Sequence, residues 1–530
     1  MWVDLLVENL LARSPGPHVI NDAKTPSGHV TIAHLRGVLM HQCIARALAD
    51  RDAETAFLYG FDDYDPMDDL PPSLPEYAKY MGMPLADIPA PPAEPGARPR
   101  PGPPAPNYAR YFADEFEAVF MRLGARPRVY RTSEMYRAGE FDRAIRLALD
   151  RAADIREIYR EVTSSRRIDE RWWPVQVLCE QCGRIGTTNI LAWDGETVAY
   201  ECARDKVAWA QGCGHRGQRS PFGGGSKLLY RVEWPAKWEA LGVTVEGAGK
   251  DHMTRGGTHD VAVAISERIF GRPAPYAFAY EFLLYGGKKM STSKAVGATA
   301  AEILDVLRPE LARFLIVRPH PRKQVEFDPH GDTIPNLYDE YDRAAAAYFG
   351  ETANEDLART FYFSRVDGEQ PRCYRPRFSK VAQLMQIPSV DVAEAVELDK
   401  GAPLTEADRA ELARRIEDAR RWLGAYAPDS AKFEIRAVLP EGAATLSSAQ
   451  RQYLARIADA MAARRWSGEE LHTQLHALKA ELGLTPRDAF GAVYQAFLGK
   501  ESGPQAGWLL AALDPQFVQG RLREAARDAA

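Results

Sequence analysis

The chain has 530 residues, of which 45% are hydrophobic, and a formal net charge of −6. This size and composition exclude a disordered chain and predict roughly three to four domains. The acidic balance excludes a protein that coats polyanions in general, but it is compatible with a polyanion held locally by a few basic faces.

The first residues have neither the pattern of a secretion signal nor that of a membrane segment. Acidic Asp4 follows closely on Met1, and no basic segment precedes an apolar run with a small-residue cleavage site. No stretch approaches about eighteen uncharged apolar residues, which a membrane-spanning helix would need. We therefore expect a cytoplasmic protein without a membrane span.

The N-terminal region alternates between strand and helix patterns. Residues 17–21 and 55–60 are short apolar runs typical of buried strands, and residues 31–49 have the apolar periodicity of a helix. A strand, a helix and a strand within about fifty residues predict a right-handed parallel crossover, the opening unit of a doubly wound nucleotide-binding fold. We expect the ligand site at the C-terminal ends of these strands.

A turn formed by Thr25, Pro26, Ser27 and Gly28 precedes the predicted helix. A helix N-terminus offers unpaired N–H groups and a positive dipole end, so such a turn can accept a phosphate. Gly28 would permit close approach of a nucleotide. An ordinary capped helix is the alternative interpretation of these four residues.

Residues 88–106 are rich in proline and interrupt the alternating pattern. Proline is unsuited to the interior of a helix or a sheet, so this segment is predicted to be an exposed insertion. Helical periodicity returns at residues 108–123, and one long charged helix is expected over residues 139–162.

Four of the six cysteines lie between positions 179 and 213. Cys179 and Cys182 form a CxxC pair, and Cys202 and Cys213 follow within about thirty residues, a spacing that suits a closed, structural zinc site. His215 competes with Cys213 as the fourth ligand. A redox-active dithiol is the alternative to zinc.

Beyond the cysteine-containing insertion the α/β pattern resumes. Residues 243–246 and 277–282 are predicted strands that flank a helix near residues 260–270. From about residue 337 nearly every segment has helical periodicity, which predicts a separate α-helical domain. The expected division is a Rossmann-type domain in two halves (1–170 and 233–335), an inserted zinc-binding module (171–232) and a C-terminal α-helical domain (336–530).

Two segments resemble the signatures of class I aminoacyl-tRNA synthetases. Residues 23–36 resemble the segment that ends in a His-Ile-Gly-His type tetrapeptide, and here that tetrapeptide is Thr31-Ile32-Ala33-His34. Threonine thus stands at the first histidine position and alanine at the glycine position. The run Lys289-Met290-Ser291-Thr292-Ser293-Lys294 resembles the Lys-Met-Ser-Lys-Ser loop of the same family.

Amino-acid activation needs no protein nucleophile, because the carboxylate of the amino acid attacks the α-phosphorus of ATP and pyrophosphate leaves. Catalysis is therefore positioning and neutralisation of charge. The resemblance assigns this role to Lys289 and Lys294, on a glycine-flanked loop that can close over the triphosphate, and to His34 and Thr31. It implies ATP as substrate, with Mg²⁺, and further nucleotide contacts from Pro26, Ser27, Gly28, Asp251, His252, Met290, Ser291 and Ser293.

A more extended resemblance, to the class I lysyl-tRNA synthetases, covers nearly the whole chain. It includes the runs Arg231-Val232-Glu233-Trp234-Pro235-Ala236-Lys237-Trp238 and Ala248-Gly249-Lys250-Asp251-His252. A lysine pocket must desolvate an ammonium group, so it needs a carboxylate and benefits from an aromatic face. The resemblance places Ala23, Thr25, Asp62, Trp234, His252, Tyr280 and Glu281 at the amino acid. Core packing is the alternative for Trp234 and Trp238.

The resemblance implies that the protein activates L-lysine with ATP and transfers it to the 3′ end of tRNA(Lys), whose anticodon the helical domain would bind. Arg464, Arg465 and Trp466 offer charge and stacking for RNA, with a solvated helix end as the alternative.

Three other functions remain open. They are a degenerate paralogue that binds tRNA or nucleotide without aminoacylation, a nucleotidyltransferase of related fold, and a zinc-ribbon nucleic-acid-binding protein without catalysis. The degenerate paralogue is suggested by Thr31, Ala33 and Thr292, which depart from the family signatures. The sequence leaves the oligomeric state open, with a monomer favoured.

Overall fold

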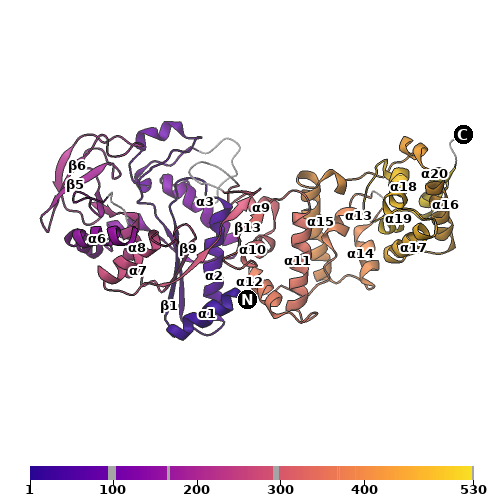
Figure 1. The fold of residues 1–530 in the computed structure, drawn as a ribbon, viewed down its shortest axis with the longest axis horizontal. Coiled ribbons are helices and arrows are strands. Elements are labelled where there is room, and N and C mark those ends of the chain that lie inside the picture. Colours follow the sequence, from indigo (N-terminus) through magenta and orange to yellow (C-terminus); the bar gives the residue numbers. More distant parts are fainter. Residues whose placement is uncertain are drawn as a thin grey trace. The chain divides into compact units, whose positions relative to one another are not determined.

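The computed structural model describes residues 1–92, 103–163, 168–289, 298–366, 368, 370–387 and 390–527. The chain divides into two units. The first comprises Met1–Phe327 and Thr352–Gly368, and the second comprises Asp328–Glu351 and Glu369–Ala530. In Figure 1 the first unit contains the labelled strands together with helices, whereas the second, in orange and yellow, is drawn with helices.

Five parallel strands form the central sheet of the first unit, in the order β10-β9-β1-β2-β3. They are β1 (His18–Lys24), β2 (Thr55–Phe61), β3 (Arg128–Arg131), β9 (Val245–Gly249) and β10 (Tyr276–Tyr280). The order runs outward from β1 to β3 on one side and from β9 to β10 on the other, so its direction reverses between β1 and β9. Ligands of doubly wound folds bind at the carboxyl ends of the strands beside such a point.

The predicted crossover between the first two strands is confirmed. β1 pairs with β2 along its whole length, from His18 to Lys24, and α2 (Leu35–Ala49) connects the two strands. A 3₁₀ turn (Ile32–His34) precedes α2. The helix is buried on nearly all sides, including every residue from Leu35 to His41, because residues 2–13 and 309–317 pack against it as well as the sheet.

The ends of the proline-rich insertion lie together. The backbone N–H of Tyr108 donates to the carbonyl of Ile88 over 2.8 Å, so the chain leaves and rejoins the unit at one place. Residues 93–102 lie outside the described residues. The following helix, α3 (Tyr108–Arg122), begins where the Asn107 side chain accepts from the backbone N–H of Arg110.

The single helix expected over residues 139–162 is wrong. The structure has two helices there, α5 (Asp142–Asp150) and α6 (Ala152–Thr163). Arg151 between them leaves helical backbone, with φ −109° and ψ 27°. Its guanidinium donates to Asp154 Oδ2 and to the carbonyl of Arg268, which lies far away in sequence. That long-range bond stabilises a break that helical periodicity does not reveal.

The cysteine-containing insertion begins and ends in one pair of antiparallel strands, β4 (Val175–Val177) and β8 (Ser226–Leu228). Between them β5 (Thr188–Trp193), β6 (Val198–Cys202) and β7 (Arg216–Arg219) form an antiparallel sheet. β4 and β8, the base of the module, therefore hold its two ends side by side, and the backbone N–H groups of Ile185 and Gly186 also donate to the carbonyl of Gly82. α7 (Tyr230–Leu241) follows β8 directly and leads into β9, and α8 (Thr258–Arg268) connects β9 to β10.

A second small sheet follows the central one. It contains β11 (Leu283–Tyr285), β12 (Lys288–Lys289) and β13 (Val325–Phe327) in the order β12-β11-β13. The remaining helices of the first unit are α1 (Trp2–Arg13), α4 (Thr132–Arg137), α9 (Ile303–Val306), α10 (Pro309–Val317) and α12 (Glu355–Ser364).

The described part of the second unit is helical, as expected. Its helices are α11 (Thr333–Tyr348), α13 (Phe378–Leu384), α14 (Val392–Lys400), α15 (Glu406–Ala425), α16 (Ser448–Ala463), α17 (Gly468–Glu481), α18 (Pro486–Leu498), α19 (Ala506–Ala512) and α20 (Pro515–Ala526). α15, α16 and α17 each begin with a capping box, at Thr405, Ser447 and Ser467. The unit differs from the expected 336–530 because α12 groups with the first unit. Among the described residues, no helix is long and apolar enough to cross a membrane.

A buried arginine provides a test of how the first unit is held together. The Arg313 side chain is fully buried, and its guanidinium donates to the carbonyls of Phe363 and Leu123 and to Gln42 Oε1 over 2.6–3.1 Å. Arg313→Met leaves these acceptors without donors, so we expect the free energy of unfolding to fall by about 3 kcal/mol. Urea denaturation followed by circular dichroism measures it. The exposed control Arg322→Met should change it by less than about 0.5 kcal/mol, and an equal loss in both variants would contradict this account.

Candidate active site

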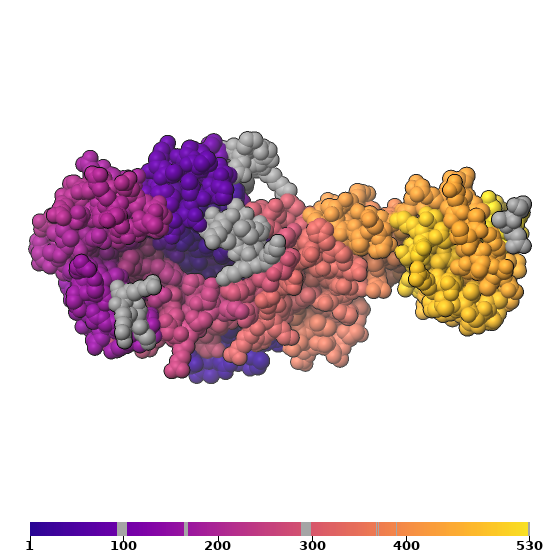
Figure 2. Space-filling model, turned by 45° about the horizontal axis from the view of Figure 1, so that its top comes forward, coloured from indigo at the N-terminus to yellow at the C-terminus, as the bar shows by residue number. Residues whose placement is uncertain are grey.

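A pocket with a volume of about 670 Å³ lies at the carboxyl ends of the strands on both sides of the switch point. Its walls come from the ends of β1, β2, β9 and β10, from the end of β8 and from the start of α7. Figure 2 shows a hollow in the first unit, with indigo N-terminal residues at its bottom and magenta residues along its border. The pocket is therefore where the doubly wound topology predicts a ligand.

Most of the residues expected in the site line this pocket. They are Ala23, Thr25, Ser27, His34, Asp62, Trp234, Asp251, His252, Tyr280 and Glu281. Pro26, Gly28 and Thr31 are buried beside it but do not line it. The side chain of Lys289 and the whole of Met290, Ser291, Ser293 and Lys294 lie outside the described residues. Binding and catalytic roles for all of these residues stay predictions.

The turn at residues 25–28 is not directly at the N-terminus of α2, as was expected. Val30, Thr31 and the 3₁₀ turn separate it from the helix. The turn is held instead by the backbone N–H of Ser27, which donates to the Thr25 carbonyl, and by the Tyr108 hydroxyl, which donates to the Ser27 carbonyl. An anion at Ser27 would therefore contact the Ser27 side chain and would not lie at the N-terminus of α2.

Backbone hydrogen bonds join the two signature regions. The N–H of Ile32 donates to the carbonyl of Ala298 over 3.2 Å, and the N–H of Ala300 donates to the carbonyl of Val30 over 2.7 Å. Thr31 and Thr299 form the antiparallel bridge between these bonds. The chain that follows the second signature is thus attached to the first.

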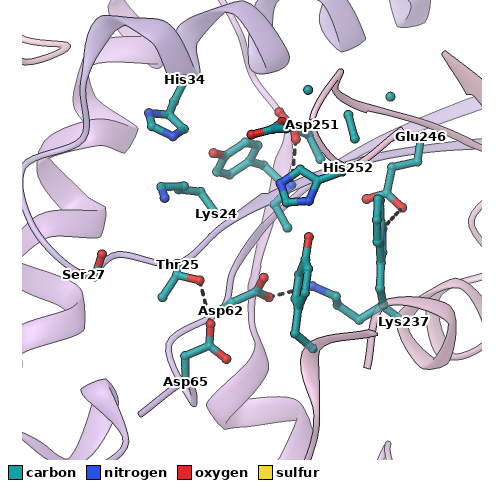
Figure 3. Close-up of a pocket in the computed structure, with 18 of the residues that line it drawn as sticks. Lys24, Thr25, Ser27, His34, Asp62, Asp65, Lys237, Glu246, Asp251 and His252 are labelled. Carbon is teal, nitrogen blue, oxygen red and sulfur yellow. Dashed lines mark hydrogen bonds and ion pairs between the residues drawn. The ribbon is translucent and has the colours of Figure 1, made fainter. Parts of the chain in front are cut away.

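One end of the pocket is basic and hydroxyl-bearing. Figure 3 shows His34, Lys24 and Ser27 on one side of the pocket and Glu246 and Lys237 on the other. Burial lowers the pKa of His34 to about 3, and the nearby Lys24 charge contributes to the lowering. Burial also lowers the pKa of Lys24, although nearby carboxylates oppose it. His34 is therefore a neutral imidazole near neutral pH, next to a lysine, which suits an anionic ligand.

Several carboxylates of the pocket are already paired with lysines of the chain. Lys237 Nζ lies 2.8 Å from Asp62 Oδ1, and Lys250 Nζ lies 2.6 Å from Glu281 Oε2. Lys227 Nζ lies 2.9 Å from Asp65 Oδ1. Asp62 and Glu281 were expected to meet the ammonium group of a substrate, and in the structure each has an internal partner. The two buried lysines, 227 and 237, were not expected in the site.

Glu246 is held by three neutral donors. Asn21 Nδ2 donates to Oε1 over 2.7 Å and Trp234 Nε1 donates to Oε2 over 2.8 Å, while Trp238 Nε1 also donates to Oε2. Burial raises the pKa of Glu246, and Lys237 opposes that effect. The two tryptophans are both buried, so core packing accounts for Trp238, whereas Trp234 also lines the pocket.

An aromatic wall completes this end of the pocket. The Tyr230 ring lies parallel to that of Trp234, with centroids 5.9 Å apart and an angle of 19°, and His252 packs against both rings. Tyr230 is 42% exposed although it is a large aromatic residue. Such a wall offers π faces to a cation or to the methylene groups of a ligand.

Asp22 is the carboxylate that sequence reasoning missed. It lines the pocket at 8% exposure and accepts from the backbone N–H of Ala23 over 2.9 Å. Its nearest basic group is His41 Nδ1, 3.8 Å away. His41 is neutral, because Nδ1 donates to the Gly37 carbonyl and Nε2 accepts from the N–H of Gly247. Asp22 thus faces the pocket without a cation at ion-pair distance among the described residues.

Burial and the neighbouring Glu246 raise the pKa of Asp22 well above its usual range. A cationic ligand at Asp22 would favour the ionised form and so gain a charge-assisted bond. An acidic residue inside an apolar strand was the signal that could have identified both Asp22 in β1 and Glu246 in β9.

The four cysteines expected to bind a metal come together in the inserted module. Their sulfur atoms all lie within 4.8 Å of one another, with Cys179 and Cys213 at 3.7 Å and Cys182 and Cys202 at 3.7 Å. Zn–S bonds of about 2.3 Å give sulfur separations of about 3.8 Å in a tetrahedron, so the thiols fit zinc. Cys213 belongs to this cluster and His215 does not, so Cys213 stays the predicted fourth ligand.

Comparisons with known proteins agree with this architecture. A family model described as tRNA synthetases class I (K) matches residues 1–367, and one described as an anticodon binding domain matches residues 396–526. A lysine--tRNA ligase of Methanosarcina barkeri is 35% identical, with 99% of this chain and 97% of the relative covered. One from Archaeoglobus fulgidus is 34% identical, with 99% of each chain covered. The chain therefore belongs to the class I tRNA synthetases of the K, or lysine, type.

Proposed function

We propose that this protein activates L-lysine with ATP and transfers the lysyl group to the 3′ end of tRNA(Lys). In the first step a lysine carboxylate oxygen attacks the α-phosphorus, the bond to the β-phosphate oxygen breaks, and lysyl-adenylate and pyrophosphate form. In the second, a hydroxyl of the terminal ribose attacks the lysyl carbonyl and AMP leaves. The observation that carries the proposal is a pocket with a basic end and an acidic, aromatic end at the switch point of the sheet.

The basic end of the pocket suits the triphosphate of ATP, which enters as its Mg²⁺ complex. Lys24 supplies charge, while Ser27 and His34 supply neutral hydrogen-bond donors. Lys289 and Lys294 would complete this end from the second signature. The reaction moves negative charge onto the leaving pyrophosphate, so donors and cations placed in advance favour its transition state.

The opposite end suits lysine. Among the described residues, Asp22 is a buried carboxylate of the pocket without a cation at ion-pair distance. We therefore propose that it receives the side-chain ammonium group of the substrate lysine. The aromatic wall of Tyr230 and Trp234, together with Tyr280, would cover the aliphatic part of the side chain. Lys237 neutralises Asp62 and Lys250 neutralises Glu281. These two lysines would thus prevent the substrate ammonium group from binding at either carboxylate.

The second unit would bind the anticodon part of the tRNA, since the anticodon domain model covers most of it. The Arg464 guanidinium lies over the Trp466 ring at 3.7 Å and also contacts Glu470 over 2.9 Å. The Arg464 and Trp466 side chains thus contact each other just before α17 begins. That arrangement favours the interpretation of residues 464–466 as a solvated helix end over a role in RNA binding.

The four-thiolate cluster would hold one structural zinc ion. Zinc would cross-link three parts of the module, at Cys179 and Cys182, at Cys202 and at Cys213. It would fix the base strand β8, from which Lys227 reaches Asp65 in the pocket.

The central prediction is an ATP–pyrophosphate exchange that depends on lysine. We expect exchange with L-lysine and little with the other nineteen amino acids, because only lysine has a side-chain ammonium group for the acidic end. Isotope exchange with each amino acid in turn measures this. Folded, zinc-containing protein that supports no exchange with any amino acid would instead favour a paralogue that binds nucleotide or tRNA without aminoacylation.

A single substitution tests the lysine end. Asp22→Asn keeps the shape of the side chain and removes its charge, so we expect the KM for lysine to rise about tenfold to a hundredfold. The KM for ATP should stay within about twofold, since the triphosphate lies at the other end. The control Asp52→Asn removes an exposed carboxylate at φ 55°, where asparagine is tolerated. Equal kinetic effects in the two variants would refute the role of Asp22.

Metal analysis tests the cysteine cluster. We expect about one zinc ion per chain in the wild type and far less in Cys182→Ser, because three thiolates bind zinc more weakly than four. The temperature of unfolding should fall in the same variant. Cys373→Ser, which changes a cysteine of the second unit, should leave both quantities unchanged. Full zinc content in Cys182→Ser would show that this thiol is not a ligand.

A further inference from the structure

The hydroxyl of Thr31 contacts the imidazole of His34. Thr31 Oγ1 lies 3.1 Å from His34 Nδ1. Thr31 is 3% exposed, and it does not line the pocket, whereas His34 does. Its hydroxyl therefore points to His34 from behind the pocket wall.

The backbone fixes this contact. Thr31 is extended, with φ −77° and ψ 159°, and is held by its bridge to Thr299. The N–H of His34 donates to the Thr31 carbonyl over 3.1 Å, which closes a 3₁₀ turn between the two residues. Both ends of the hydroxyl–imidazole pair are thus attached to ordered backbone, and the ring has little freedom to rotate.

The direction of this hydrogen bond decides what His34 can offer the pocket. A neutral imidazole has one N–H donor and one acceptor nitrogen. If the Thr31 hydroxyl donates to Nδ1, the ring proton is on Nε2, and the ring can donate to a ligand. In the opposite tautomer Nε2 carries a lone pair, which repels an anion. His34 shares its end of the pocket with Lys24 and Ser27, where an anion is the suitable ligand.

We propose that Thr31 is a positioning residue whose hydroxyl donates to His34 Nδ1 and holds the ring as the Nε2–H tautomer. His34 then donates to a phosphate oxygen of ATP without carrying a charge. This inference rests on the proposed function for the identity of the anion. Burial and Lys24 keep the imidazole neutral against the opposing effect of a hydrogen bond to the Thr31 backbone, and they support the proposal because an imidazolium next to Lys24 would be repelled.

Nuclear magnetic resonance of ¹⁵N-histidine-labelled protein tests the tautomer directly. We expect the His34 signals of the wild-type chain to be those of the Nε2–H tautomer, with assignment by their loss in His34→Ala. In Thr31→Val, which removes the hydroxyl and keeps the branched shape, a mixture of tautomers should appear. A wild-type ring protonated on Nδ1 would overturn the proposal. This measurement uses ATP-free protein, so it stands even if no amino acid is activated.

Kinetics test whether Thr31 acts through His34. We expect Thr31→Val to lower kcat of lysine-dependent exchange about tenfold, the effect of one hydrogen bond, and Thr31→Ser to retain the wild-type rate within about twofold. In a His34→Ala background Thr31→Val should cause no further loss. The same loss in both backgrounds, or no loss in either, would overturn the proposal. Absence of exchange in the wild type would instead count against the proposed function, and the tautomer would still decide this inference.

Discussion

The buried ion pair between Lys237 and Asp62 organises the site. It joins α7 to the end of β2, and both side chains are almost fully buried. Removing either partner would leave an uncompensated charge in a region of low dielectric, which costs several kcal/mol. Lys237 also lies 3.8 Å from Glu233, which in turn pairs with Lys227. Charges of alternating sign thus connect the central sheet to the base of the inserted module.

This network explains how a pocket with many carboxylates can select one position for a cation. Lys227 and Lys237 are held by Asp65, Asp62 and Glu233, and neutral donors satisfy Glu246. Only Asp22 faces the pocket at low exposure without such a partner among the described residues. In the proposed function, Asp22 is therefore the position left for the substrate lysine, because the protein's own lysines and the donors to Glu246 occupy the other carboxylates.

Local patterns predicted the parts of the fold that depend on neighbouring residues. The first crossover, the helices that begin with capping boxes and the cysteine cluster all follow from spacings within a few dozen residues. Asp62 was expected at the site from the family resemblance, and it directly follows β2. Its partner Lys237 lies 175 positions later, and no local signal relates the two. The break at Arg151 was missed for the same reason, since it depends on the distant carbonyl of Arg268.

The two-stranded base of the inserted module has a consequence for how this protein can change. Because β4 and β8 lie side by side, the chain enters and leaves the module at one place, but Ile185, Gly186 and Trp193 within the module also donate to Gly82 and Asp150 outside it. The base is connected to the site as well, since Lys227 on β8 belongs to the charge network of the pocket. A change in the length or sequence of the module would therefore be transmitted to the pocket wall formed by Lys227 and Leu228.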